Sequence, residues 1–231
     1  MKETFLRRKY DNNYYKFLKS HWFPKFHMIK YVQYLMKNKN KNIKWLDIGC
    51  SIGYLIQELL DNKIQAYGID ISIVALGNIL LGLRQRVVAG SIVHIPYKTE
   101  TFDVVSAFDV IEHIHPQETE LAFRELNRVL KTGGYLFLTT PNSKYMGNWI
   151  YDLTHINVRP PMYWKIMLKK HGFKSKREYI PSFLKYYIKQ RYNFYIPIPN
   201  KLCFFFEEPL RFIFGKIFSW RSRLYIFAKK L

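Results

Sequence analysis

Short apolar runs alternate with helical segments between residues 44 and 139, and this alternation restricts the fold more than any other feature of the chain. Strands that are apolar throughout are typical of a parallel sheet buried on both faces. Helices between such strands form the crossovers that a parallel sheet needs. We therefore expect an α/β fold in three layers. The expected strands are 45–48, 66–69, 87–89, 102–108 and 135–139, and the expected helices are 54–60, 74–81 and 117–130.

The ends of the chain are expected to extend this core, because 231 residues suit a single α/β domain. Apolar residues at helical spacing in 14–36 predict two helices, which Pro24 separates. Later elements are expected at 162–171 (helix), 173–180 (strand) and 223–228 (last strand). The expected parts are an N-terminal helical cap (1–43), a core (44–180), a basic aromatic insertion or lid (181–222) and the last strand (223–231).

Charge is unevenly distributed along this strongly basic chain, whose formal net charge is +20. Residues 1–44 carry +10, residues 45–155 carry −4, and residues 156–231 carry +14. Basic ends around a mildly acidic centre indicate an anionic partner, such as nucleic acid, a membrane surface or a phosphorylated substrate. The alternative is a lysine-rich protein that uses positive charge only to stay soluble.

The sequence also indicates the cellular compartment in which the protein works. Its basic N-terminal residues are not followed by the apolar segment that a signal peptide needs. No run of about 18 apolar residues free of charge occurs, so no membrane-spanning helix is expected. Two cysteines, Cys50 and Cys203, are too few for a disulfide framework. We therefore expect a protein of the reducing cytoplasm.

A turn with two glycines follows the first expected strand, in Trp45-Leu-Asp-Ile-Gly-Cys-Ser-Ile-Gly53. Glycine permits a sharp turn and a close approach of the backbone to a ligand, and the next helix offers N–H groups at its start. Asp70 ends the second expected strand, 21 residues after Gly49. A carboxylate at that position can accept hydrogen bonds from both hydroxyls of a ribose. Together the two features predict a nucleoside-binding crevice.

Four segments, in sequence order, carry a resemblance to a known family. They are Asp47-Ile-Gly-Cys-Ser-Ile-Gly53, Gly68-Ile-Asp-Ile-Ser72, Phe102-Asp-Val-Val-Ser-Ala-Phe-Asp-Val-Ile-Glu-His-Ile114 and Leu130-Lys-Thr-Gly-Gly-Tyr-Leu-Phe-Leu-Thr-Thr-Pro-Asn142. They resemble the motifs of class I methyltransferases that use S-adenosylmethionine (SAM), and are similar to the group from ubiquinone and menaquinone biosynthesis. The resemblance implies a three-layer Rossmann-like methyltransferase fold with a mostly parallel, seven-stranded sheet and an antiparallel last strand.

The resemblance implies that the first motif surrounds the methionine part of SAM. Asp47 would lie near the amino group of the cofactor. Gly49, Cys50 and Ser51 would face its methionine moiety, and Gly53 would complete the turn. Here Ser51 stands where many members of the family have a glycine.

Later motifs are implied to hold the adenosine part. Asp70 would bind the ribose, and Ile71 would lie against the adenine. Ser91 and Ile92 stand where the family often has an acidic residue with an apolar neighbour, so the contact to the adenine amino group differs here. Asp109 would lie where the end of the fourth strand meets the cofactor.

Two other families share part of the first motif. A nicotinamide-binding unit usually has G-x-G-x-x-G, whereas this chain has G-x-S-x-G with Ser51 in the middle. That string also matches the nucleophile turn of α/β-hydrolases. However, fewer than 50 residues precede it, none of them forms an oxyanion-loop signature, and Asp70 would have no purpose in a hydrolase. Both readings are therefore less favoured than a methyltransferase.

Candidate residues for the acceptor side follow the fourth and fifth expected strands. Ligands bind at the carboxyl ends of parallel strands, which places Glu112 and His113 near the cofactor. Asp152 and His155 lie in a segment that resembles the acceptor region of the family. The candidate catalytic residues are His113, His155 and Asp152, and the alternative is a structural role for each. No metal is expected, because His113 and His115 alone are a weak ligand set.

Three functions are compatible with these features. The first is SAM-dependent methylation of a small-molecule, lipid or glycan-linked acceptor. The second is an RNA methyltransferase, although an Asn/Asp-Pro-Pro-Tyr string is absent from the sequence. The third is a SAM-binding interaction protein without catalysis. Residues 202–221, rich in aromatic and basic side chains, are predicted to cover the acceptor pocket and to contact an anionic membrane surface; nucleic acid is less favoured as their partner.

Overall fold

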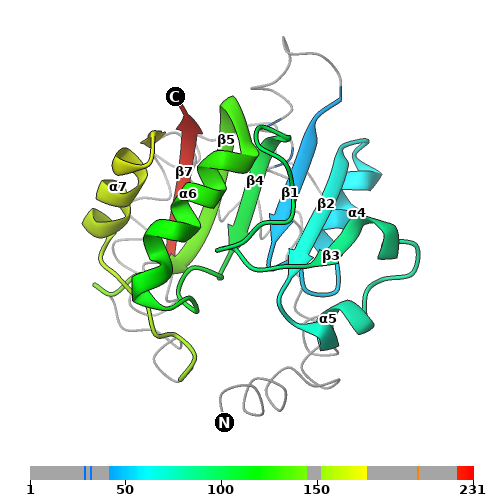
Figure 1. The fold of residues 1–231 in the computed structure, drawn as a ribbon, viewed down its shortest axis with the longest axis horizontal. Coiled ribbons are helices and arrows are strands. Elements are labelled where there is room, and N and C mark those ends of the chain that lie inside the picture. The colour runs from blue at the N-terminus through cyan, green and yellow to red at the C-terminus, as the bar shows by residue number, and fades with distance from the viewer. Residues whose placement is uncertain (1–28, 30–31, 33–41, 145–151, 176–201, 203–222) are drawn as a thin grey trace.

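A seven-stranded sheet forms the centre of the computed structural model, in the order β3-β2-β1-β4-β5-β7-β6 (Figure 1). Its strands are β1 (Lys44–Ile48), β2 (Gln65–Asp70), β3 (Val87–Ala89), β4 (Phe102–Phe108), β5 (Leu130–Pro141), β6 (Phe173–Ser175) and β7 (Arg223–Lys230). The structure describes residues 29, 32, 42–144, 152–175, 202 and 223–231.

Strands β1 to β5 pair in parallel, and β7 runs antiparallel to both β5 and β6. The chain runs outward from β1 to β3 and then crosses back, so that β4 pairs with the other side of β1. This reversal makes the carboxyl ends of β1 and β4 a switch point, where ligands bind in open α/β sheets. The expected α/β fold, with a mostly parallel seven-stranded sheet and an antiparallel last strand, is confirmed.

Two apolar layers, one on each face of the sheet, follow from the alternation of side chains along the strands. Leu46 and Ile48 of β1 belong to a cluster that includes α6 (Thr119–Val129) and α7 (Pro161–Lys170). Trp45, the neighbour of Leu46 whose side chain lies on the opposite face of β1, belongs to a second cluster that includes α4 (Tyr54–Asp61). In Figure 1, α6 lies in front of β4 and β5. The helices therefore cover both faces and complete three layers.

Two expected boundaries are wrong for local reasons. The helix expected at 74–81 is the shorter α5 (Ile73–Gly77), because Asn78 caps it: the Asn78 side-chain amide donates to the Val74 carbonyl. The strand expected at 135–139 begins five residues earlier, and its two glycines form a bulge in pairing with β4 and not a separate turn. A Cβ on Gly134 would lie 2.9 Å from the Asp103 carbonyl oxygen, so the strands can approach only at a glycine.

Several predicted elements fall on residues that are not described. Of the helical segment 14–36, only Ile29 and Val32 are described, and both are helical and buried. The end of the strand expected at 173–180 and, apart from Leu202, the predicted lid at 181–222 lie outside the described residues. Among the helices that the structure describes, none is both long and apolar enough to cross a membrane.

Candidate cofactor crevice and acceptor site

The turn after β1 is built from three residues with positive φ. Gly49 and Gly53 have φ angles of 71° and 89°, and Ser51, between them, has a φ of 51°. Gly53 is the N-cap of α4, and no side chain caps that helix. The first N–H groups of α4 therefore face the turn without a side-chain acceptor, as at many sites that bind anionic or polar ligands.

Gly49 also lies against the segment after β4. A Cβ at this position would lie 2.5 Å from the Val110 Cγ2 atom, closer than two carbons can approach. The Val110 side chain therefore packs against the backbone of Gly49, at a point where any Cβ would overlap with it. This contact links the turn after β1 to residues 109–113, which carry the candidate acceptor groups.

Asp70, at the end of β2, holds the turn in place. Its Oδ2 accepts a hydrogen bond from the Ser51 N–H at 2.7 Å, and its Oδ1 accepts one from the Ser72 N–H at 2.8 Å. Burial raises the pKa of Asp70 above its ordinary 3.8, although the N–H groups of Ser72 and Ser51 counteract this. Since an ionised carboxylate can accept about four hydrogen bonds, Asp70 has capacity for further donors.

Two other residues of the first motif are buried. Asp47 Oδ1 accepts a hydrogen bond of 2.7 Å from the Ser106 hydroxyl, which in turn accepts one from the Trp45 indole at 2.8 Å. The Cys50 thiol is free, and burial, with the charges of Asp47 and Asp70, raises its pKa. Cys50 therefore stays a neutral thiol and packs in the apolar cluster beneath the turn.

The residues expected near an adenine have different exposure. Ile71 directly follows Asp70 and leaves 77% of its surface exposed, which is unusual for an isoleucine beside a sheet. Ser91 forms a bridge with His94, and Ile92 is buried in the core cluster with Ile69. Ile71 therefore offers an exposed apolar side chain just after the carboxyl end of β2, whereas Ile92 packs inside the core.

Asp109 is held at the end of β4 by two neighbouring strands. It has a φ of 55°, and its carboxylate accepts a hydrogen bond of 2.9 Å from the Thr139 hydroxyl of β5. The Arg223 guanidinium of β7 forms an ion pair of 2.9 Å with the same carboxylate. These contacts direct Asp109 toward β5 and β7 and fix the start of the segment that carries Glu112 and His113.

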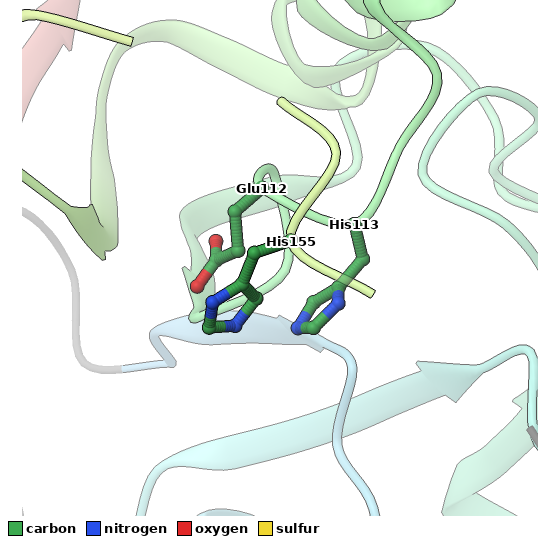
Figure 2. Close-up of side chains that lie close together, drawn as sticks. All are labelled: Glu112, His113 and His155. Carbon is green, nitrogen blue, oxygen red and sulfur yellow. The ribbon is translucent and has the colours of Figure 1, made fainter. Parts of the chain in front are cut away.

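Glu112, His113 and His155 form a compact cluster beside this segment. Figure 2 shows the carboxylate of Glu112 and both imidazoles turned toward one another. The two rings lie 4.8 Å apart, centroid to centroid. One ligand atom from each residue lies within 4.8 Å of those of the other two. The structure therefore brings together two histidines that are 42 residues apart in the sequence.

The Glu112 side chain is completely buried, and neither of its carboxylate oxygens has a hydrogen-bond partner in the described structure. The Thr140 hydroxyl lies close enough to lower the pKa of Glu112 somewhat but does not reach hydrogen-bonding geometry. Burial, followed by the negative charge of Asp109, raises the pKa of Glu112 well above its ordinary 4.5. A buried carboxylate without partners is costly, which makes Glu112 a candidate functional residue.

The tautomers of both histidines follow from their partners. The Thr154 hydroxyl donates to Asp152 Oδ1 at 2.6 Å and lies 2.9 Å from His113 Nδ1, so it accepts from that nitrogen. His155 Nε2 lies 3.5 Å from Asp152 Oδ2, which can only accept when it is ionised. When both rings are neutral, these contacts favour a proton on Nδ1 of His113 and on Nε2 of His155.

Asn157 anchors the second segment of the cluster to the first. Its N–H donates to the Glu112 carbonyl at 2.9 Å, and its side-chain amide donates to the Ile111 carbonyl at 3.2 Å and to the Thr119 hydroxyl at 2.9 Å. Asn157 is fully buried. The sequence analysis did not identify Asn157, and no local pattern distinguishes it from any other polar residue in a loop.

The predicted site residues fall into two groups in the structure. The cofactor candidates lie at or just after the carboxyl ends of β1, β2, β3 and β4, and Val110, which was not predicted from the sequence, connects Gly49 to the segment of the acceptor candidates. The candidates His113, His155 and Asp152 lie together. Their individual roles stay predictions. His115, in contrast, caps the 3₁₀ turn Pro116–Glu118, where its Nδ1 accepts from the Gln117 N–H.

Comparison with known proteins identifies the family of this fold. The family described as "Methyltransferase domain" matches residues 21–177. An uncharacterised protein of Methanocaldococcus jannaschii is 32% identical over 109 residues, which cover 47% of this chain and 45% of that protein. A malonyl-[acyl-carrier protein] O-methyltransferase of Legionella pneumophila is 36% identical over 101 residues, which cover 41% of this chain and 35% of that protein. The chain thus spans less than half the length of these relatives.

A solved structure supports the same fold. A SAM-dependent methyltransferase of Archaeoglobus fulgidus superposes with a TM-score of 0.64 at 18% sequence identity, covering 95% of this chain and 100% of that one. At this identity the similarity concerns the fold alone. The family match covers well over half of the chain and confirms the class I resemblance; the narrower likeness to ubiquinone and menaquinone enzymes stays a prediction. The chain belongs to the methyltransferase domain family, for which SAM is the cofactor.

Proposed function

We propose that this protein transfers the methyl group of SAM to an oxygen of a small-molecule or lipid acceptor. The observation that carries the proposal is the contact between Gly49 and Val110. It places a cofactor turn of the methyltransferase family directly beside the segment that leads to Glu112 and His113. A methyl donor and an acceptor can then meet at the carboxyl ends of β1 and β4, as the sheet topology requires.

The cofactor side supports the proposal through its unused hydrogen-bonding capacity. Asp70 uses two acceptor sites on the backbone of the turn, and burial still raises its pKa. Ribose hydroxyls are donors that would complete its partners. Ile71 offers an exposed apolar surface for an adenine. Gly49, Cys50 and Ser51 would then lie along the methionine part of SAM, with Asp47 behind them.

Methyl transfer is a displacement in which a lone pair of the acceptor oxygen forms a bond to the methyl carbon. The bond between this carbon and the sulfonium breaks, and its electron pair stays on sulfur as S-adenosylhomocysteine forms. The protein has to align the acceptor, exclude water and take up a proton when the acceptor loses one. We assign this acceptor side to His113 and His155, with Asp152 orienting His155.

Oxygen methylation of a small or carrier-linked molecule is favoured by the Legionella relative, which is described as an O-methyltransferase of a malonyl group. A lipid acceptor is consistent with the predicted lid at 181–222 and its aromatic side chains. A cytoplasmic location and a contact of 202–221 with anionic membrane surfaces stay proposals that rest on the sequence.

Labelled SAM, incubated with the purified protein and with small-molecule and lipid extracts, tests the activity. We expect a labelled product that depends on both the extract and the protein. Heat-inactivated protein gives the background. If the protein binds S-adenosylhomocysteine but labels nothing in any extract, the activity is absent and the protein is a SAM-binding module.

Ser51→Ala should retain at least about a third of the methyl-transfer rate, because Ser51 acts through its backbone. Its hydroxyl is buried without a hydrogen-bond partner in the described structure, whereas a serine nucleophile needs a base within hydrogen-bond reach. Removing the hydroxyl leaves the N–H bond to Asp70 intact. Initial rates of both proteins with the identified acceptor check this. Hydrolysis of model esters by the wild type, lost in Ser51→Ala, would instead establish a hydrolase.

A further inference from the structure

We propose that Glu112, His113 and His155 bind a divalent transition-metal cation of the Zn²⁺ type. These side chains present three electron-rich atoms to one point: a carboxylate oxygen and two imidazole nitrogens, all within 4.8 Å of one another (Figure 2). Two histidines and one glutamate are a common ligand set of zinc sites that keep a position for substrate. The existence of the site is independent of the acceptor, whereas its part in catalysis rests on the proposed function.

The carboxylate of Glu112 is the first independent support for a metal site. Glu112 is completely buried, and neither of its oxygens has a hydrogen-bond partner in the described structure. Buried charged groups normally have hydrogen-bond partners, pair with an opposite charge or coordinate a metal. The Arg223 guanidinium, whose charge acts on Glu112, forms its ion pair of 2.9 Å with Asp109 instead. A cation between Glu112 and the two imidazoles would satisfy this carboxylate directly.

The hydrogen-bond partners of the two imidazoles are the second support for a metal site. Histidines that bind metals nearly always donate their other ring N–H to a carboxylate, a carbonyl or water. His113 Nδ1 lies 2.9 Å from the Thr154 hydroxyl and 3.3 Å from the Thr154 carbonyl oxygen. His155 Nε2 lies 3.5 Å from an Asp152 carboxylate oxygen. Nε2 of His113 and Nδ1 of His155 are then the atoms that we assign to the metal.

The distances allow a metal after small side-chain movements. Zinc bonds to nitrogen and oxygen are about 2.0–2.2 Å long, so two ligands of a tetrahedral site lie about 3.4 Å apart. The three ligand atoms here lie within 4.8 Å of one another. Side-chain rotations that move each atom by about 1 Å would therefore bring all three to bonding distance of one cation. Three protein ligands leave a fourth position. With a methyl acceptor bound there, the cation would hold the acceptor oxygen and lower its pKa.

The choice between Zn²⁺ and Mg²⁺ follows from the ligand types. Imidazole nitrogen suits Zn²⁺, whereas Mg²⁺ is bound mainly by oxygen. Asp109, whose charge acts on Glu112, is engaged by Arg223 and Thr139. The described residues thus provide one buried oxygen donor and two nitrogen donors, and Mg²⁺ should bind at least about 100-fold more weakly than Zn²⁺.

The test is a calorimetric titration of the full chain, without a histidine tag and freed of metal by a chelator, with Zn²⁺ and separately with Mg²⁺. We expect one Zn²⁺ per chain. Glu112→Gln and His155→Gln should each weaken Zn²⁺ binding at least about 100-fold. Asp152→Asn, which removes only the orienting charge, should weaken it about 10- to 100-fold. Co²⁺ should give the visible absorption of a site with nitrogen ligands.

His115→Asn is the matched control, because it removes a histidine two residues from His113 and keeps a side chain that can cap the following turn. It should bind Zn²⁺ as the wild type does. Thermal melting verifies that each variant is folded. Two different ligands are substituted, so that the test still works if one of the two variants does not fold. The proposal is overturned if the wild type does not bind Zn²⁺ stoichiometrically, or if a folded Glu112→Gln or His155→Gln variant binds it unchanged. In either case the three side chains would share a proton instead of a metal.

Binding of S-adenosylhomocysteine is measured in parallel without metal. Intact cofactor binding together with absent Zn²⁺ binding rejects only the metal site. Zn²⁺ binding without cofactor binding rejects the proposed methyl transfer and keeps the metal site. If the site also serves the reaction, added Zn²⁺ should restore methyl transfer to the chelator-treated wild type and not to His155→Gln.

Discussion

Gly49→Ala should lower the free energy of unfolding by about 2–5 kcal/mol and weaken binding of S-adenosylhomocysteine by about 100-fold or more. A non-glycine residue at the φ of 71° costs about 1–2 kcal/mol. The new Cβ would also lie 2.5 Å from Val110 Cγ2, and such overpacking typically costs about 1–3 kcal/mol. Moving the turn by about 1 Å can reduce function 100-fold. Chemical denaturation and calorimetry measure the two effects.

Two variants separate the causes of this loss. Gly77→Ala, in α5, adds a Cβ that meets no atom within 4 Å, so its stability should change by less than about 1 kcal/mol. Gly49→Ala combined with Val110→Ala should recover part of the stability, because it removes the overlap but not the strained φ. A Gly49→Ala protein as stable and as tightly binding as the wild type would mean that this turn does not approach the segment after β4.

Asp70→Ala should weaken binding of S-adenosylhomocysteine by about 10- to 150-fold, equivalent to about 1.5–3 kcal/mol for hydrogen bonds to a charged group. The loss has two sources: contacts to the ribose, and the bonds from Asp70 to the N–H groups of Ser51 and Ser72 that shape the turn. An analogue without the two ribose hydroxyls separates them. If Asp70 holds the ribose, the variant should lose much less affinity for the analogue than for the natural compound.

Ser72→Ala is the control for Asp70→Ala. The Ser72 hydroxyl caps α5 by accepting from the Ala75 N–H at 3.1 Å, so its removal should cost about 1 kcal/mol of stability. It leaves the backbone N–H that donates to Asp70 in place, and cofactor affinity should change less than about threefold. Equal losses of affinity for both ligands in Asp70→Ala would assign Asp70 to the turn alone.

The sequence predicted the central sheet well because β1 and β4, at its centre, are almost completely buried. The bounds of β3 and β4 agree with the expected 87–89 and 102–108, since the apolar run ends where the strand ends. The start of β5 was missed because Gly133 and Gly134 are typical of a turn. In the structure they allow a bulge against β4, where a side chain would meet the Asp103 carbonyl. Sequence patterns do not distinguish these two uses of glycine.

The candidate site could be predicted only one segment at a time. Glu112 and His113 follow one strand, and Asp152 and His155 follow another, but their contact depends on Asn157, which binds the Ile111 and Glu112 carbonyls. Such hydrogen bonds between distant segments leave no periodic pattern in a sequence. For the same reason the complete burial of Glu112, which carries the metal proposal, could not be inferred from its type or its neighbours.

The central claim is that the crevice around Gly49 and Asp70 binds SAM. Calorimetric titration of the wild-type chain with S-adenosylhomocysteine, the product of methyl transfer, tests this claim most directly, because it requires neither the acceptor nor a metal. We expect saturable binding of one molecule per chain, with a higher melting temperature in the presence of the ligand. An absence of both heat and thermal shift at millimolar ligand would contradict it.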